Sequence, residues 1–277
     1  MRCFDIHLKE VFPFLGEQNA DPVLTAYLPY NMTEMSREND RRPCVLICPG
    51  GGYRFVSQRE AEPIALHFLP EGYNVFVLTY SVDTYQFPTQ LRQVAAAMEM
   101  IHMHAEQWNC DPNRVAIAGF SAGGHLAAHY SNTYNIPEVR EVFPDSKPVQ
   151  ASILSYPVIT ADRAYCHPGR FEHLLGHSYP MSEAELEKFS CHRLVSENTP
   201  PAFVWHTTDD AVVPVQNSLF YTQALAKFGI PFELHIYPKG FHGLVTVDDA
   251  TNGELDAVTK RAYQWLENMK AWLKHTL

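Results

Sequence analysis

A strand pattern that runs without a gap into a glycine-serine turn, and then into a helix, constrains this chain most. Residues 115–118 are Val-Ala-Ile-Ala, an apolar run typical of a strand buried on both faces. Residues 119–124 are Gly-Phe-Ser-Ala-Gly-Gly, a Gly-x-Ser-x-Gly motif followed by small residues. Such a turn is tight, so the positions two before and two after the serine need to lack a side chain. We therefore expect Ser121 to stand above a sheet, at the N-terminus of a helix.

Strand-like and helix-like segments alternate along most of the chain. Short apolar runs predict strands at 23–28, 44–48, 75–80, 115–118, 151–155, 203–206 and 232–237. Helical spacing of apolar residues predicts helices at 64–69, from 88 onward, and at 123–130, 218–228 and 255–273. This alternation indicates a parallel sheet with crossover helices. The expected fold class is α/β, with a doubly wound, mostly parallel sheet.

Residues 160–198 interrupt the alternation. They contain no strand pattern, but Ser182-x-x-Glu185 has the form of a capping box, as does Ser57-x-x-Glu60 earlier in the chain. We expect 160–198 to be a small helical insertion, or cap, over one edge of the sheet, within one domain that spans 1–277. A chain of 277 residues and 31.5 kDa can bury roughly three quarters of its unfolded surface, so one core suffices.

Charge and composition exclude several classes of protein. The formal net charge of −10 argues against a nucleic acid or an anionic membrane as partner. No apolar stretch is long enough for a membrane span, and the first residues lack the pattern of a signal peptide. The six cysteines are scattered, with no Cys-x-x-Cys pair, which favours buried free thiols over disulfides or zinc. These features together predict a cytoplasmic protein.

Three other predicted strands end in residues that could assist a reactive serine. The strand at 44–48 is followed by the glycines at 50–52, whose backbone N–H groups could approach a substrate closely. The strand at 203–206 is followed by Asp209 and Asp210, and that at 232–237 by His242 in a glycine-flanked loop. A serine nucleophile needs a base, and the base needs an acid to orient it. Either aspartate fits the acid by its position alone.

Four motifs together resemble the α/β-hydrolase serine esterases, and within them the acetyl-esterase and feruloyl-esterase-like branch. Its bacterial members are often described as sugar-ester or xylan-acetyl hydrolases. The resemblance extends from about residue 23 to the C-terminus. Pro49 stands where many lipases and esterases have histidine, which favours this branch. The motifs are Pro-Gly-Gly-Gly-Tyr at 49–53, Gly-Phe-Ser-Ala-Gly-Gly at 119–124, His-Thr-Thr-Asp-Asp-Ala-Val-Val-Pro-Val at 206–215 and Lys-Gly-Phe-His-Gly at 239–243.

The resemblance implies a role for each motif. Ser121 would be the nucleophile and His242 the general base. The family spacing places the orienting acid four residues after His206, which selects Asp210 over Asp209. An oxyanion hole would be formed by the backbone N–H groups of Gly51, Gly52 and Ala122.

The activity implied is that of a serine carboxylesterase, an acetylesterase-like hydrolase that acts through an acyl-enzyme. Its substrates would be short-chain acyl esters, above all acetyl esters, of sugars or small alcohols, and it would need no metal or other cofactor. The expected partner is this small-molecule ester, without nucleic acid or membrane, and a homo-oligomer stays open. Two alternatives are a prolyl-oligopeptidase-like peptidase or amidase, and a non-catalytic binding protein of the same fold.

Substrate contacts are expected from the glycine-rich turn and from the insertion, which would set the specificity for the alcohol. The candidates are Tyr53, His173, His177 and Tyr179.

Two further groups of charged or titratable residues have simpler interpretations. His125 and His129 are four residues apart on a predicted helix, but the glutamate of a His-Glu-x-x-His zinc motif is absent. We interpret them as packed histidines. Arg59, Glu60 and Glu62 are explained by helix capping and a surface ion pair.

Overall fold

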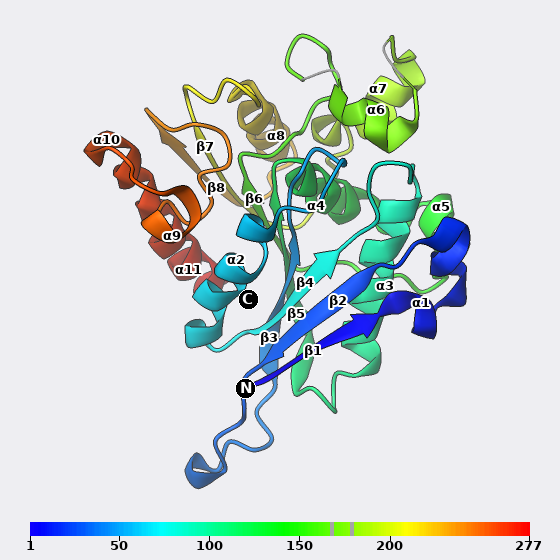
Figure 1. Cartoon of the computed structure of the whole chain (residues 1–277), viewed down its shortest axis with the longest axis vertical. Helices are drawn as coiled ribbons and strands as arrows, with labels where there is room; N and C mark the ends of the chain where they lie inside the picture. Colours follow the sequence, from blue (N-terminus) through cyan, green and yellow to red (C-terminus); the bar gives the residue numbers. More distant parts are fainter. Residues whose placement is uncertain (167–168, 178–179) are drawn as a thin grey trace.

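The apolar runs of the sequence form one eight-stranded sheet in the computed structural model, which describes residues 1–166, 169–177 and 180–277 (Figure 1). The strand order is β1-β2-β4-β3-β5-β6-β7-β8. The strands are β1 (Arg2–His7), β2 (Val23–Leu28), β3 (Arg42–Cys48), β4 (Asn74–Thr79), β5 (Cys110–Phe120), β6 (Ala151–Ser155), β7 (Ala202–Thr207) and β8 (Phe232–Tyr237).

Most of this sheet is parallel. Every neighbouring pair from β4 through β3, β5, β6 and β7 to β8 runs in the same direction, whereas β1 and β2 are antiparallel additions at one edge. The predicted fold class, a mostly parallel α/β sheet, is therefore confirmed. The carboxyl ends of parallel strands lie at the same edge of the sheet, so the loops after β3, β5, β7 and β8 meet there.

Helices cover both faces of the sheet (Figure 1). One core cluster contains side chains of α3, α4 and α8, and the other contains side chains of α2 and α11. The α-helices are α1 (Leu8–Val11), α2 (Glu62–Phe68), α3 (Thr89–Met103), α4 (Ala122–Thr133), α5 (Pro137–Arg140), α6 (Gly169–Leu175), α7 (Glu183–Phe189), α8 (Gln216–Lys227), α9 (Asp249–Asn252), α10 (Ala257–Lys260) and α11 (Gln264–Thr276). Short 3-10 helices are η1 (Pro13–Asn19), η2 (Thr33–Met35), η3 (Gln58–Glu60), η4 (Leu69–Glu71), η5 (Cys191–Arg193) and η6 (Arg261–Tyr263).

The strand β3 shows why the central strands read as continuous apolar runs. Cys44, Leu46 and Cys48 pack into one core cluster, and Val45 and Ile47 pack into the other. Successive side chains of a strand point to opposite faces, and here both faces are covered by helices. From Cys44 to Cys48 every residue is buried, so a polar side chain there would need a hydrogen-bond partner inside the core, whereas Arg42 at the start of the strand is only half-buried.

Three local predictions were wrong. The strand β1 was missed because it lies at the sheet edge and alternates exposed with half-buried residues, so no apolar run marks it. The predicted helix 255–273 is divided into α10, η6 and α11. Ser57 makes no side-chain capping bond, whereas the capping box of Ser182 and Glu185 is confirmed.

The expected insertion at 160–198 runs between β6 and β7 and contains α6, α7 and η5. In Figure 1, α6 and α7 lie beyond the end of the sheet at which α4 begins. That this segment acts as a cap stays a prediction.

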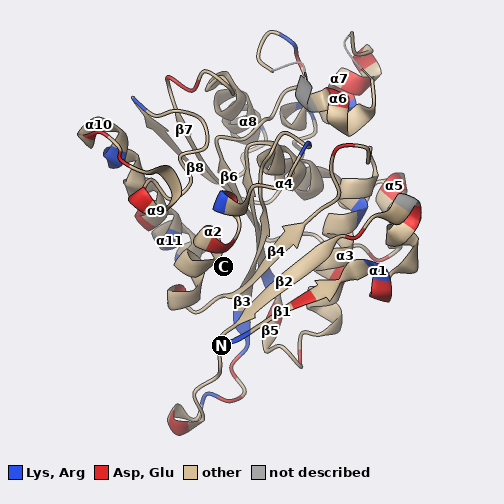
Figure 2. Cartoon of the chain, viewed as in Figure 1, with Lys and Arg blue, Asp and Glu red and all other residues tan. Residues whose placement is uncertain are grey.

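Charged residues are interspersed over the helices and loops that surround the sheet (Figure 2). All six cysteines are free thiols, and five of them are buried, as expected, whereas Cys3 on the edge strand is exposed. Within the described ranges, no helix combines the length and the apolar character that a membrane span requires.

Candidate active site

Ser121 occupies the sharp turn between β5 and α4. Its backbone has φ 54° and ψ −117°, a conformation that few residues with a side chain adopt. The turn is possible because its neighbours are glycines. A Cβ atom at Gly119 would lie 2.3 Å from the carbonyl oxygen of Gly123, and one at Gly123 would lie 2.1 Å from that of Cys48. The Ser121 side chain is thereby presented at the N-terminus of α4.

A chain of two hydrogen bonds joins Ser121 to residues of two distant loops. The Ser121 hydroxyl lies 2.7 Å from His242 Nε2, and His242 Nδ1 lies 2.7 Å from Asp210 Oδ2. Because a carboxylate only accepts, Nδ1–H donates to Asp210 and Nε2 is left to accept the serine proton. The three side chains are therefore arranged for a proton to pass from Ser121 to His242.

Asp210, and not Asp209, lies against His242. Its other oxygen, Oδ1, accepts the backbone N–H groups of Val212 and Val213, both at 2.9 Å. Burial alone would raise the pKa of Asp210, but hydrogen bonds from His206, His242 and Val213 outweigh burial and hold this pKa below its usual range. Asp210 is therefore a fixed anion at neutral pH.

Asp209 has a different partner. Its Oδ1 accepts the backbone N–H of Gly240 at 2.6 Å, which ties the end of β7 to the loop after β8. The adjacent aspartate therefore supports the loop that carries His242 without touching the imidazole.

The glycine turn after β3 presents unpaired N–H groups beside Ser121. Gly51 and Gly52 have φ angles of 126° and 65°, in the left-handed region, and a Cβ atom at Gly51 would lie 1.9 Å from the carbonyl oxygen of Phe55. In the described part of the chain, the N–H groups of Gly51, Gly52 and Ala122 have no acceptor. Such groups can receive hydrogen bonds from a developing oxyanion.

A cavity of about 280 Å³ opens at this place. It exposes the serine, the imidazole and the glycine turn together, so a small substrate could reach all three. Its lining residues are Gly51, Gly52, Phe55, Ser57, Arg59, Glu60, Ser121, His242 and Gly243.

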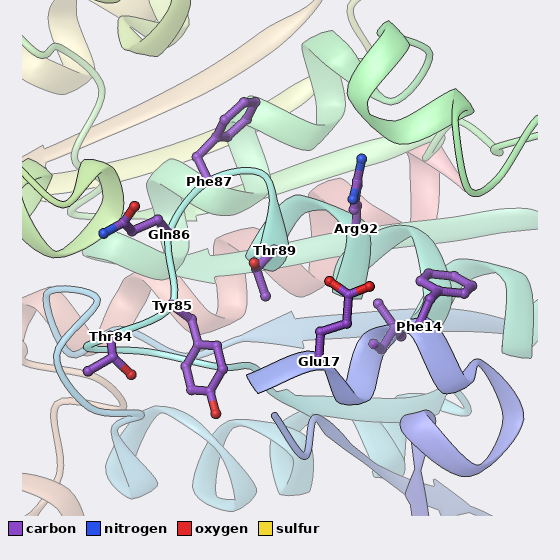
Figure 3. A pocket seen from close by; sticks show the side chains of 9 residues that line it. Phe14, Glu17, Thr84, Tyr85, Gln86, Phe87, Thr89 and Arg92 are labelled. Atoms are coloured by element: carbon purple, nitrogen blue, oxygen red, sulfur yellow. The ribbon is translucent and has the colours of Figure 1, made fainter. Parts of the chain in front are cut away.

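A second cavity of similar size has none of this chemistry. It lies between η1 and the segment that leads into α3 (Figure 3). It contains no serine or cysteine beside a base, and its lining residues are Phe14, Leu15, Glu17, Thr84, Tyr85, Gln86, Phe87, Thr89 and Arg92.

Comparison with known proteins identifies the family of this chain. The family described as BD-FAE matches residues 30–225. The chain belongs to the BD-FAE family. It has the α/β-hydrolase fold, and a crystal structure of an acetyl ester-xyloside bifunctional hydrolase from Caldicellulosiruptor lactoaceticus superposes with a TM-score of 0.83 at 33% identity, over 99% of this chain and 96% of the other.

Two curated proteins are similar to this BD-FAE chain over most of its length. Endo-1,4-beta-xylanase B of Butyrivibrio fibrisolvens is 38% identical over 80% of the chain, and an acetylxylan esterase of Xylanibacter ruminicola is 34% identical over 74%. The matched regions are 36% and 42% of those two proteins, so the chain spans about two fifths of the length of these relatives.

Of the expected substrate contacts of this BD-FAE chain, the three that the structure describes, Tyr53, His173 and His177, are not among the residues that line the cavity. Tyr53 is buried, and its hydroxyl lies 2.7 Å from His125 Nδ1. His173 lies 3.4 Å from Asp83, and exposed His177 lies 2.6 Å from Glu185, as measured between ring nitrogen and carboxylate oxygen. Tyr179 lies outside the described residues. Their roles in binding stay predictions.

The packed-histidine interpretation of His125 agrees with its surroundings. Its Nε2 lies 2.9 Å from the carbonyl oxygen of Phe189, and burial lowers its pKa to about 4, so the ring is neutral. Across the described ranges, no group of three His, Cys, Asp or Glu residues is arranged to hold a metal.

Sequence reasoning was wrong about two residues of the cavity lining, Arg59 and Glu60, and missed a third, Phe55. Among the described residues Arg59 makes no ion pair within 4.0 Å, and it donates to the carbonyl oxygens of Thr251 and Gly243. Glu60 is not an exposed capping residue, because it is 4% exposed and lies beside the glycine turn. Phe55 was not considered, although this large apolar residue is 59% exposed and lines the cavity. No periodic pattern could have found any of the three, because all lie in the irregular segment between β3 and α2.

Proposed function

We propose that this chain is a serine carboxylesterase that hydrolyses short-chain acyl esters, above all acetyl esters, of sugars or small alcohols. The observation that carries this proposal is the hydrogen-bonded chain of Ser121, His242 and Asp210 beside the unpaired N–H groups of the glycine turn. The sugar substrate is supported by the names of the relatives, which include an acetylxylan esterase and an acetyl ester-xyloside hydrolase.

The reaction would proceed in two halves. His242 Nε2 takes the Ser121 proton as Oγ attacks the ester carbonyl carbon. The resulting imidazolium is stabilised by Asp210, and it then protonates the leaving alcohol. In the second half, His242 Nε2 takes a proton from water as its oxygen attacks the acyl-enzyme carbonyl. The bond to Ser121 Oγ then breaks, and the imidazolium returns the proton to Oγ as the carboxylic acid leaves.

Backbone N–H groups would stabilise the negative charge of both tetrahedral intermediates. Ala122 offers its N–H at the first position of α4, where the helix dipole adds to the effect. Gly51 and Gly52, which line the cavity together with Ser121, offer theirs from the glycine turn. A donor of this kind is typically worth about 10²–10³ in kcat.

Acyl groups of two to four carbons should be the best substrates. The cavity is small, and Phe55 is the one large apolar side chain among its lining residues. Each methylene that enters an apolar groove gains about 0.8 kcal/mol, which would raise kcat/KM several-fold per carbon. We expect no such rise when kcat/KM is measured on p-nitrophenyl esters from acetate to decanoate.

This assay, extended to anilide substrates, separates the esterase from the alternative functions. A maximum at eight carbons or more would contradict the small-pocket interpretation. Hydrolysis of aminoacyl-p-nitroanilides in preference to p-nitrophenyl acetate would replace the esterase by a peptidase or amidase. Failure to turn over any ester or anilide would indicate a binding protein.

Phe55 should contribute to recognition of the alcohol. An exposed aromatic ring at the cavity can pack against the C–H face of a sugar ring, and removing about 20–60 Å² of apolar surface from water is worth about 0.5–1.5 kcal/mol. Phe55→Ala should therefore lower kcat/KM two- to tenfold for an acetylated xylose, and less for p-nitrophenyl acetate. Phe228→Ala, at an exposed phenylalanine next to the end of α8, is the matched control.

His173→Ala in the same assay tests the expectation that the 160–198 segment sets alcohol specificity. A loss confined to the acetylated sugar, and larger than that of Phe55→Ala, would assign the alcohol contact to the insertion. Equal losses on both substrates would indicate that His173 has a packing role.

A further inference from the structure

Glu60 is a buried carboxylate that connects two parts of the candidate active site. It is the last residue of η3, between the glycine turn and α2. Its Oε2 accepts the backbone N–H of Gly50 at 2.8 Å, and its Oε1 accepts the hydroxyl proton of Tyr156 at 2.8 Å. Both carboxylate oxygens therefore accept a hydrogen bond. Gly50 lies beside Ser121, and Tyr156 lies against His242.

The bond to Gly50 fixes the start of the glycine turn. A Cβ atom at Gly50 would lie 2.6 Å from Glu60 Oε2 and 3.0 Å from Ser121 Cβ, so Gly50 is packed between the carboxylate and the serine. Because its N–H is taken by Glu60, Gly50 does not offer an oxyanion donor. The next two residues of the turn, Gly51 and Gly52, keep their N–H groups unpaired.

The hydrogen bond from Tyr156 connects Glu60 to His242. The ring of Tyr156 packs edge-on against the imidazole of His242, with 5.1 Å between the ring centroids. The neighbour of Glu60 in η3, Arg59, donates to the carbonyl oxygen of Gly243 at 3.0 Å. One short segment thus contacts both the glycine turn and the histidine loop.

The burial of Glu60 lowers the free energy of unfolding when its carboxylate is ionised. Burial raises the pKa of Glu60, and the hydrogen bonds from Tyr156 and Gly50 offset only part of the rise. In the described ranges Glu60 has no ion-pair partner within 4.0 Å. A carboxylate whose folded-state pKa is raised destabilises the protein once the pH is high enough to ionise it. A buried carboxylate with a raised pKa that also lines a cleft beside a nucleophile is a candidate for a functional role.

We propose that Glu60 is a positioning residue of the esterase. Its carboxylate orients the Gly50–Gly52 turn so that the next N–H groups face the tetrahedral intermediate, and it holds Tyr156 against His242. This inference rests on the proposed function, because it assigns Glu60 to the same site.

Glu60→Ala and Glu60→Gln test the proposal with p-nitrophenyl acetate as substrate. Glu60→Ala should lower kcat about 100-fold, the size of a lost oxyanion donor, with KM changed less than threefold. Glu60→Gln should lower kcat about tenfold, because its amide offers one acceptor oxygen where the carboxylate offers two. Glu62→Gln replaces an exposed acid two residues away and should leave kcat unchanged.

Two further measurements distinguish positioning from a structural role. The inhibition constant of phenylboronic acid, which forms a tetrahedral adduct on a serine, should rise in parallel with the loss of kcat. The Tm of Glu60→Gln at pH 7–8 should not fall below that of the wild type, because the variant removes a buried charge. Glu60→Gln keeps the test decisive if Glu60→Ala does not fold.

Specific outcomes would overturn the proposal. One is a Glu60→Gln enzyme with wild-type kcat and wild-type affinity for phenylboronic acid. Another is a variant whose kcat falls together with Tm while boronate affinity is unchanged, which would assign Glu60 to folding. A wild-type protein that hydrolyses no ester would contradict the proposed function itself, independently of Glu60.

Discussion

Ser121→Ala is expected to reduce turnover of p-nitrophenyl acetate by about 10⁴-fold or more, while the protein stays folded. The variant removes the one oxygen that can attack the ester, and neither His242 nor the oxyanion donors can replace it. The backbone strain at this position is unchanged, because alanine and serine both carry a Cβ atom. The melting temperature of the variant should therefore stay close to that of the wild type.

Ser131→Ala is the matched control for Ser121→Ala. Ser131 lies on the same helix, α4, and its hydroxyl donates to the carbonyl oxygen of Ala127 at 2.8 Å. Its loss should leave turnover near the wild-type value. A Ser121→Ala protein that retains more than one tenth of wild-type turnover would exclude Ser121 as the nucleophile.

Asp210→Asn should cost up to about 10⁴ in kcat, whereas Asp209→Asn should cost less than tenfold. An asparagine at position 210 can donate to His242 Nδ1, which would place the imidazole proton on Nε2, where it blocks proton transfer from Ser121. It would also remove the negative charge that stabilises the imidazolium. An asparagine at position 209 can still accept the Gly240 N–H through its amide oxygen.

Measuring kcat and Tm for both asparagine variants decides between the two acids. Similar Tm values with a kcat loss confined to Asp210→Asn would support the assignment. A greater kcat loss in Asp209→Asn would show that the static geometry around Asp210 does not represent the reacting enzyme.

The strands that carry the candidate site were predictable because of where they lie in the sheet. The second half of β5 is buried on both faces, so residues 115–118 form an uninterrupted apolar run that ends at Gly119, whereas the polar first half, at 111–114, was not predicted. The turn at Ser121 was equally visible, because glycines are needed on both sides of it. The edge strand β1 was not visible, since an exposed strand is under no such constraint.

The sequence by itself determined the central strands, the serine turn and the pair of aspartates from which the acid comes, because each depends on residues that are close together along the chain. By position alone either aspartate could be the acid, and the family resemblance selected Asp210. The direction of the two side chains is set by tertiary structure, which turns Asp210 toward His242 and Asp209 toward Gly240. Tertiary structure also decided the place of Glu60, which sequence reasoning put at the surface. Its partners Gly50 and Tyr156 are 10 and 96 residues away along the chain, and only folding brings their hydrogen-bond donors to one carboxylate.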